Sequence, residues 1–144
     1  MAIFNPTREQ VRDFFIQTWQ KYQHKAALSA MEKIALGWIM KHPEYHAMLD
    51  NPEARNKDFS VAEGQTNPFL HLSMHIALEE QISIDNPHGI REVFEQLSAK
   101  LDEHAAHHEM MECLGQVIWQ AQRNRGPLDQ QLYIELLKQR VNTH

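Results

Sequence analysis

Two runs in this 144-residue chain share the spacing His-x3-His-x3-Glu. Their members are His71, His75 and Glu79 in the first run, and His104, His108 and Glu112 in the second. Residues four apart on an α-helix lie within about 40° of one another, so each run would place its three side chains on one face. Neutral imidazole is the commonest protein ligand for transition metals, and carboxylates add negative charge. The two runs therefore predict transition-metal chemistry.

A third pair, His42 and His46, repeats the spacing, although Pro43 between them makes a shared helical face less regular. We expect His46 to complete or cover the site. A set of four or five histidines with one or two glutamates favours iron, zinc, nickel or manganese. Glu79 or Glu112 would serve as a carboxylate ligand or general base, and one of them could bridge two ions. The lack of cysteine in these clusters argues against a thiolate zinc finger.

The same histidines allow two other interpretations. A single histidine on an apolar helix face is usually a core residue that is hydrogen-bonded to a carbonyl or a carboxylate. Several unpaired buried rings would cost about 1–3 kcal/mol each, so three clusters need a common explanation. Besides a metal, that explanation can be a hydrogen-bonded His/Glu network or a metal-free acid–base site. No residue can be assigned a catalytic role from the sequence.

The elements that would hold these residues are helices, because apolar residues recur at three- and four-residue steps and strand-like alternation is missing. We predict helices that begin near Pro6 with Asn5 as the cap, at Ser29 with the capping box Ser29/Glu32, and at Pro68 with Asn67 as the cap. A fourth helix carries Ile90, a fifth runs from about Glu103 to Arg123, and a last helix holds Leu132. Pro43 should kink or restart the second helix, leaving a short segment that ends near Leu49. The fold class is thus all-α, a single-domain bundle of five or six helices over residues 1–144, with a long connection at about 50–67.

The order of the helices predicts where the histidines meet. Neighbouring helices joined by short turns run antiparallel, so the helix after Pro68 and the helix after Glu103 would be parallel. Their first turns, with the two histidine runs, would then lie at one end of the bundle. The segment with His42 and His46 ends the second helix and would reach the same end. The long connection at about 50–67 weakens this prediction, because helices joined by a long segment need not run antiparallel.

Composition narrows the class of protein. A net charge of −5 and a pI near 6.0 argue against nucleic-acid binding, and no apolar run is long enough to span a membrane. One cysteine, Cys113, excludes an intrachain disulfide and fits a reducing cytoplasm, as does the lack of a secretory signal pattern. No phosphate-binding glycine loop is present, so no organic cofactor is predicted. The partner that we expect is therefore a small molecule or a metal ion. The sequence is also compatible with a homo-oligomer.

Several longer strings resemble a known family. "FNPTREQVRDFF", "HPEYH", "GQTNPFLHLSMHIALEEQISIDNPHGIR" and "MMECLGQVIWQAQ" together resemble the bacterial domain-of-unknown-function family numbered 1841, over most of residues 3 to 138. This resemblance implies a helical, cytoplasmic, single-domain protein and assigns no functional residues. A looser likeness connects the chain to hemerythrin-like and DinB-like metal-binding bundles. Hemerythrin-like chains place His-x3-Glu ahead of His-x3-His, an order that this chain lacks, so the likeness concerns architecture.

Two functional hypotheses follow. The favoured one is metal binding, with hydrolytic or redox chemistry at the metal. The rival hypothesis is a non-catalytic interaction or regulatory protein, in which the histidines form a buried polar network and apolar helix faces recruit a partner or a second copy.

Overall fold

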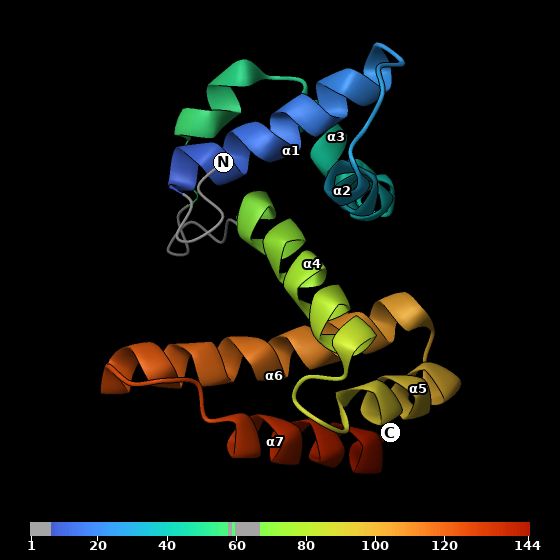
Figure 1. The fold of residues 1–144 in the computed structure, drawn as a ribbon, viewed down its shortest axis with the longest axis vertical. Coiled ribbons are helices and arrows are strands. Elements are labelled where there is room, and N and C mark those ends of the chain that lie inside the picture. The colour runs from blue at the N-terminus through green and yellow to red at the C-terminus, as the bar shows by residue number, and fades with distance from the viewer. Residues whose placement is uncertain (1–6, 58, 60–66) are drawn as a thin grey trace. The chain divides into compact units, whose positions relative to one another are not determined.

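A computed structural model describes residues 7–57, 59 and 67–144, and within these ranges it contains helices and no strand (Figure 1). The α-helices are α1 (Arg8–Gln23), α2 (Ala30–Met40), α3 (His46–Leu49), α4 (Pro68–Ile84), α5 (Ile90–Lys100), α6 (Glu103–Asn124) and α7 (Gln130–Thr143). Two 3-10 helices, η1 (Pro43–Tyr45) and η2 (Pro52–Asn56), lie between α2 and α4. The predicted all-α class is confirmed.

The predicted number of five or six helices is wrong, because the described part of the chain has seven α-helices. The additional one is α3, a single turn after Pro43. Proline has no N–H to donate and its ring blocks the helix before it, so α2 ends at Met40 and the chain restarts. The restart forms η1 and then α3 instead of a bent extension of α2.

Local capping signals explain where α1, α2 and α4 begin. Ser29 accepts a hydrogen bond from the Glu32 amide, while the Glu32 side chain accepts one from the Ser29 amide, which confirms the predicted capping box. Asn67 caps α4 as predicted, since its Oδ1 accepts from the amides of Phe69 and Leu70. The predicted cap Asn5 and its neighbour Pro6 lie outside the described residues, and Thr7 is the N-cap of α1.

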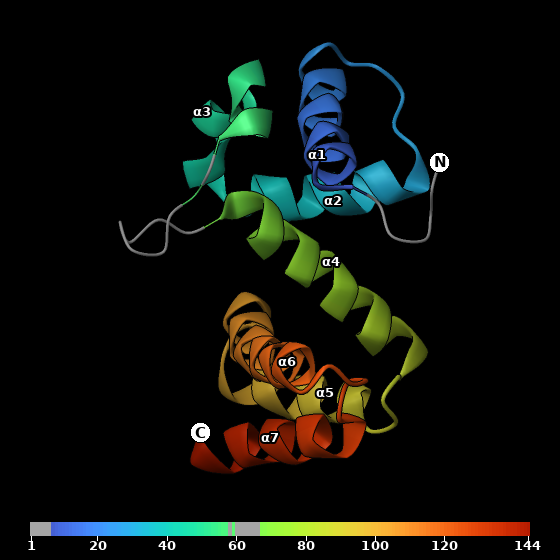
Figure 2. The same cartoon turned by 90° about the vertical axis from the view of Figure 1, so that its left-hand side faces the viewer.

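The chain divides into two compact units, Met1–Ile76 and Ala77–His144. In the first unit α1 packs against α2, α3 and η2 (Figure 2). Among the described residues of this unit, those buried in its apolar core are Phe15, Ile16, Trp19, Ala35, Trp38, Ile39, Leu49, Ala54, Phe69 and Leu72. This core joins the beginning of α4 to the N-terminal helices. The single-domain description of the chain stays a prediction.

In the second unit α5, α6 and α7 contact one another in all three pairs. Its buried apolar residues include Ile90, Val93, Leu97, Ala106, Met110, Leu114, Val117, Tyr133 and Leu137. Hydrogen bonds connect the end of α4 to these helices. The Tyr133 hydroxyl donates to the side chain of Gln81, and the Arg91 guanidinium donates to the carbonyls of Ile82 and Ser83. Within the described part of the chain, no helix combines the length and the apolar character that crossing a bilayer requires.

Candidate metal centre

Three histidines of the first unit bring their ring nitrogens together. His71 and His75 lie one turn apart near the start of α4, and His42 lies two residues beyond the end of α2. The Nε2 atom of His71 is 3.1 Å from Nε2 of His42 and 3.2 Å from Nε2 of His75. The ring centroids form a nearly equilateral triangle with sides of 4.8, 4.9 and 4.9 Å. One nitrogen from each ring thus points into a common space.

The end of α2 holds His42 in this position. Pro43 prevents the helix from continuing, and the ring of His42 turns back so that Nδ1 lies 2.7 Å from the carbonyl oxygen of Trp38. A carbonyl oxygen only accepts hydrogen bonds, so Nδ1 carries the hydrogen and Nε2 of the neutral ring presents its lone pair. Histidines that bind metals are commonly oriented in this way, through a hydrogen bond from the other ring nitrogen to a backbone carbonyl.

Aromatic rings fix two of the three imidazoles. The Trp38 ring stacks on His75 with centroids 4.1 Å apart, and Tyr45 stacks on His42 at 5.2 Å. His75 and His42 are almost fully buried, with exposed fractions of 0% and 2%, whereas His71 is half-buried. Burial, with a smaller contribution from Glu44, raises the pKa of Tyr45, so this phenol stays neutral near pH 7. The rings are therefore held by packing before any ligand arrives.

The distances between the nitrogens suit a single small cation. Metal–nitrogen bonds of about 2.05 Å place neighbouring ligands about 3.3 Å apart in a tetrahedral site and about 2.9 Å apart at right angles. The observed 3.1 and 3.2 Å lie between these values. With neutral rings alone, Nε2 of His71 has at most one hydrogen to share between two neighbours. A cation instead accepts a lone pair from each ring, so the donor set fits a transition-metal ion.

A family model described as Domain of unknown function (DUF1841) matches residues 7–139. The chain belongs to this family. The resemblance inferred from the sequence strings is thereby confirmed, whereas the looser likeness to hemerythrin-like and DinB-like bundles stays a prediction. Comparisons with curated proteins and with solved structures found no match. For this member of DUF1841, the geometry of the site is the basis for proposing a function.

Of the third histidine pair, His42 and His46, only His42 contacts His71 and His75 in the described contacts, and His46 lies against other residues. Nε2 of His46 donates to the carbonyl of Ile39 at 2.9 Å, and its ring stacks on Trp19 at 4.3 Å. The sequence prediction chose His46 and did not name His42 as a ligand. Pro43 indicates that His42 leaves the helix, because the residue before a proline is disfavoured in helical conformation, but it does not indicate that the ring meets His71.

The other predicted ligands of this DUF1841 chain belong to the second unit. His104 and His108 lie one turn apart on α6, half-buried, with ring centroids 4.4 Å apart. Glu79 is half-buried on α4. Glu112 is exposed and accepts a hydrogen bond from Arg140 at 2.7 Å. The predicted meeting of these residues with the first histidine run stays a prediction.

A carboxylate beside Glu112 shares the same arginine. Arg140 Nη1 also donates to Glu109, which in turn accepts from the ring of His144. Burial raises the pKa of Glu109, but hydrogen bonds and charge from Arg140 and His144 outweigh it, so the net pKa is lowered. Glu109 and Glu112 thus both pair with Arg140 in this unit.

Proposed function

We propose that this protein binds one divalent transition-metal ion through Nε2 of His42, His71 and His75. The observation that carries the proposal is the pair of Nε2–Nε2 distances, 3.1 and 3.2 Å, centred on His71. The hydrogen bond from His42 to Trp38 supports it, because it leaves the lone pair of Nε2 directed toward the other rings.

Three imidazoles favour zinc, nickel or iron, since these metals accept nitrogen ligands readily. Manganese would need a carboxylate ligand as well, so the three imidazoles favour it less. A metal held by three protein ligands keeps a position for water or substrate, and it would supply hydrolytic or redox chemistry there. The protein's own contribution is to hold the rings rigidly and to exclude water through Trp38 and Tyr45.

A second candidate function has its own support. The same two distances lie within the range of hydrogen bonds between imidazoles, as expected of a buried polar network. In that case the histidines would only stabilise the packing of α2 against α4, and the protein would act by recruiting a partner or a second copy. Such a network requires no metal, so the metal content of the protein distinguishes the two candidate functions.

The test is metal analysis of tag-free protein purified without a metal-affinity column. Wild type is compared with His71→Ala, which removes the central ring, and with His24→Ala, which removes an exposed histidine of the same unit. We expect about one metal ion per chain in wild type and His24→Ala and none in His71→Ala. After removal of the bound metal by a chelator, adding it back at a hundredfold excess over its Kd should raise the melting temperature of wild type by roughly 5–10 °C.

Circular dichroism establishes that each variant is folded. Metal-free wild-type protein whose melting temperature is unchanged by zinc, nickel, iron or manganese would reject the metal site and support the polar network. Retention of stoichiometric metal by His71→Ala would reject the proposed ligand set.

A further inference from the structure

The end of α6 carries an exposed aromatic side chain on a locally basic surface. Trp119 has an exposed fraction of 56%, whereas the other two tryptophans, Trp19 and Trp38, are buried. The guanidinium group of Arg123, one turn later, lies over the Trp119 ring at 5.1 Å from its centroid. We propose that Trp119, Arg123 and Arg125, here called the α6 patch, bind a short acidic peptide segment of another protein that carries an aromatic or leucine side chain.

The last turns of α6 do not contribute to the core of the second unit. Val117 is the last buried residue of the helix, and none of residues 118–124 is buried. Figure 1 shows these turns extending beyond the beginning of α7, and the connection to α7 turns back from them. Helices in proteins gain most of their stability by burying an apolar face. About two turns that bury no residue and still present an indole ring indicate a use outside the core.

The contact between Trp119 and Arg123 orders both side chains. Residues four apart lie on the same face of a helix, and tryptophan is the best aromatic partner for a cation. A guanidinium group that stacks through its flat face keeps its N–H donors at the edge, where a carboxylate binds in a bidentate manner. Among residues 7–57, 59 and 67–144, none forms a hydrogen bond or ion pair with the guanidinium group of Arg123 or Arg125.

The cap of α6 orders the backbone that carries Arg125. The amide of Arg125 donates to the carbonyl of Gln122 at 3.3 Å, and the amide of Gly126 donates to the carbonyl of Ala121 at 3.0 Å. Arg125 is the C-cap residue in the left-handed conformation, with φ 52°, a common way for a helix to end. Because this backbone is already ordered, binding a partner costs less conformational entropy.

The distribution of charge favours an acidic partner. Residues 113–128 contain two arginines and no aspartate or glutamate, although the chain has a net charge of −5. The acidic residues on either side of this stretch are bound to other groups. Glu112 accepts from Arg140 at 2.7 Å, and Asp129 accepts from the amide of Leu132 at 3.0 Å. The α6 patch is therefore a positive surface on an acidic protein, and it attracts a negatively charged segment.

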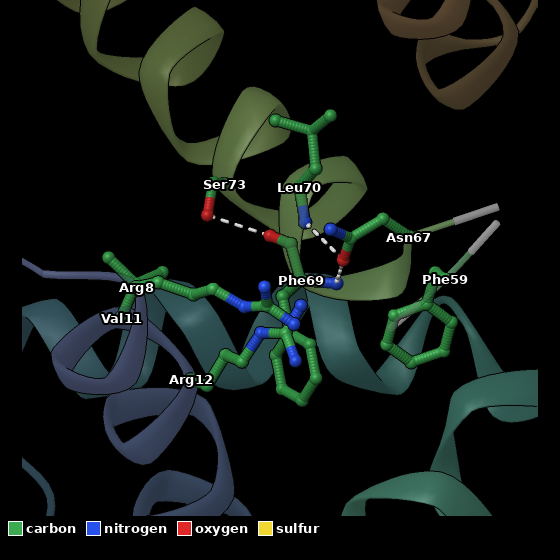
Figure 3. A pocket seen from close by; sticks show the side chains of 8 residues that line it. All are labelled: Arg8, Val11, Arg12, Phe59, Asn67, Phe69, Leu70 and Ser73. Atoms are coloured by element: carbon green, nitrogen blue, oxygen red, sulfur yellow. Dashed lines mark hydrogen bonds between the residues drawn. The ribbon is translucent and has the colours of Figure 1, made fainter. Parts of the chain in front are cut away.

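Arginines of the first unit have a different use. Arg8 and Arg12 line a pocket of about 400 Å³ between α1 and the beginning of α4 (Figure 3). Both donate to the carbonyl of Lys57, at 3.0 and 2.6 Å, and so connect α1 to the segment before α4. These contacts stabilise the unit itself, whereas the contact of Arg123 with Trp119 joins two exposed side chains of one helix.

The size of the α6 patch favours a short segment over a second copy of the chain. The exposed part of the indole ring offers on the order of 100 Å² of surface. A stable dimer buries about 800 Å² on each partner. One tryptophan with two arginines instead matches the few residues that dominate binding in many interfaces, where both residue types are enriched. We expect one aromatic or leucine side chain of the partner to cover Trp119, with acidic residues beside it.

The experiment selects binders without assuming a sequence. A phage-displayed library of short random peptides is panned on the full-length protein, and the enriched peptides are synthesised with a fluorescent label and titrated by anisotropy. We expect peptides in which aspartate or glutamate flanks an aromatic or leucine residue, with dissociation constants of about 1–100 μM. Replacing their acidic residues by asparagine or glutamine should weaken binding at least about tenfold.

Matched variants locate the binding site on the second unit. Trp119→Ser and Arg123→Gln should each weaken binding at least about tenfold, whereas Lys138→Gln, which removes an exposed charge on α7, should change it less than about twofold. Circular dichroism establishes that the variants are folded. None of these residues is a proposed metal ligand, so His71→Ala should bind the selected peptides like wild type, and failure of the metal site leaves this test unaffected.

Four outcomes would overturn the proposal. They are a selection that enriches no peptide, enriched peptides that bind Trp119→Ser as tightly as wild type, amide-substituted peptides that bind like the acidic ones, and a labelled single-stranded oligothymidylate that binds the α6 patch more tightly than the peptides. Sedimentation tests the second copy separately. A wild-type dimer that Trp119→Ser dissociates would assign the α6 patch to self-association and would also overturn the proposal.

Discussion

Arg12 offers the sharpest test of how the first unit is held together. Its side chain is buried on α1, with an exposed fraction of 3%, and its Nη1 donates to the carbonyls of Ala54, Arg55 and Lys57 at 3.4, 3.0 and 2.6 Å. These three residues belong to η2 and the residue that follows it. One guanidinium group therefore fastens the connection between α3 and α4 to α1.

The substitution Arg12→Met removes the charge and keeps most of the length of the side chain. Each lost hydrogen bond to a buried or half-buried carbonyl costs about 1 kcal/mol, and the lost cation–π contacts with Phe59 and Phe69 add up to about 1 kcal/mol. The methionine keeps apolar contact with both rings, so no large cavity term is added. We expect the free energy of unfolding to fall by roughly 3–4 kcal/mol.

Urea denaturation at neutral pH, followed by tryptophan fluorescence, measures this loss. Trp19 and Trp38 are buried in the first unit and report on it, whereas Trp119 in the second unit is exposed. Arg8→Met is the matched control, since Arg8 is exposed and should cost less than about 1 kcal/mol. The reasoning would be refuted if Arg12→Met lost less than about 1 kcal/mol, or if both variants lost the same amount.

Three further outcomes are expected. Because the Trp38 ring lies 4.1 Å from that of His75, binding of paramagnetic Ni²⁺ should quench Trp38 fluorescence, and bound nickel without quenching would place the ion elsewhere. Metal affinity should fall from neutral pH toward about pH 5, because protons compete with the metal for the ligand nitrogens. Calorimetry in two buffers of different ionisation enthalpy would detect the protons that metal binding releases. An affinity that does not depend on pH would contradict imidazole ligation. Hydrogen bonds from Trp19 and Gln23 lower the pKa of Asp50 below its ordinary 3.8, so its stabilising contribution is present above pH 3.8 and is lost as pH falls through the lowered value. Asp50→Asn should therefore have a lower free energy of unfolding than wild type at neutral pH, and the difference between the two proteins should become smaller in acid. A difference in unfolding free energy that does not change with pH, measured by urea titration, would contradict this prediction.

Much of the secondary structure follows from local signals in the sequence. The Ser29/Glu32 capping box and the Asn67 cap act over three residues, so they can be recognised without knowledge of the fold. The four-residue spacing of His71 and His75 likewise determines that they share one face of α4. Pro43 also marks the end of α2 locally, and α3 ends at Leu49, where the sequence places the end of the short segment after this proline.

Only the tertiary structure decided which third histidine joins the cluster. His42 and His46 are both imidazoles near the end of α2, and each satisfies a carbonyl of that helix, Trp38 or Ile39. Spacing does not distinguish them, because the contact with His71 joins positions 29 residues apart. The burial of Arg12 has the same origin, since its acceptors lie 42 to 45 residues away. Capping and helical periodicity act within about one turn, whereas the neighbours of a side chain across the core depend on how whole helices pack.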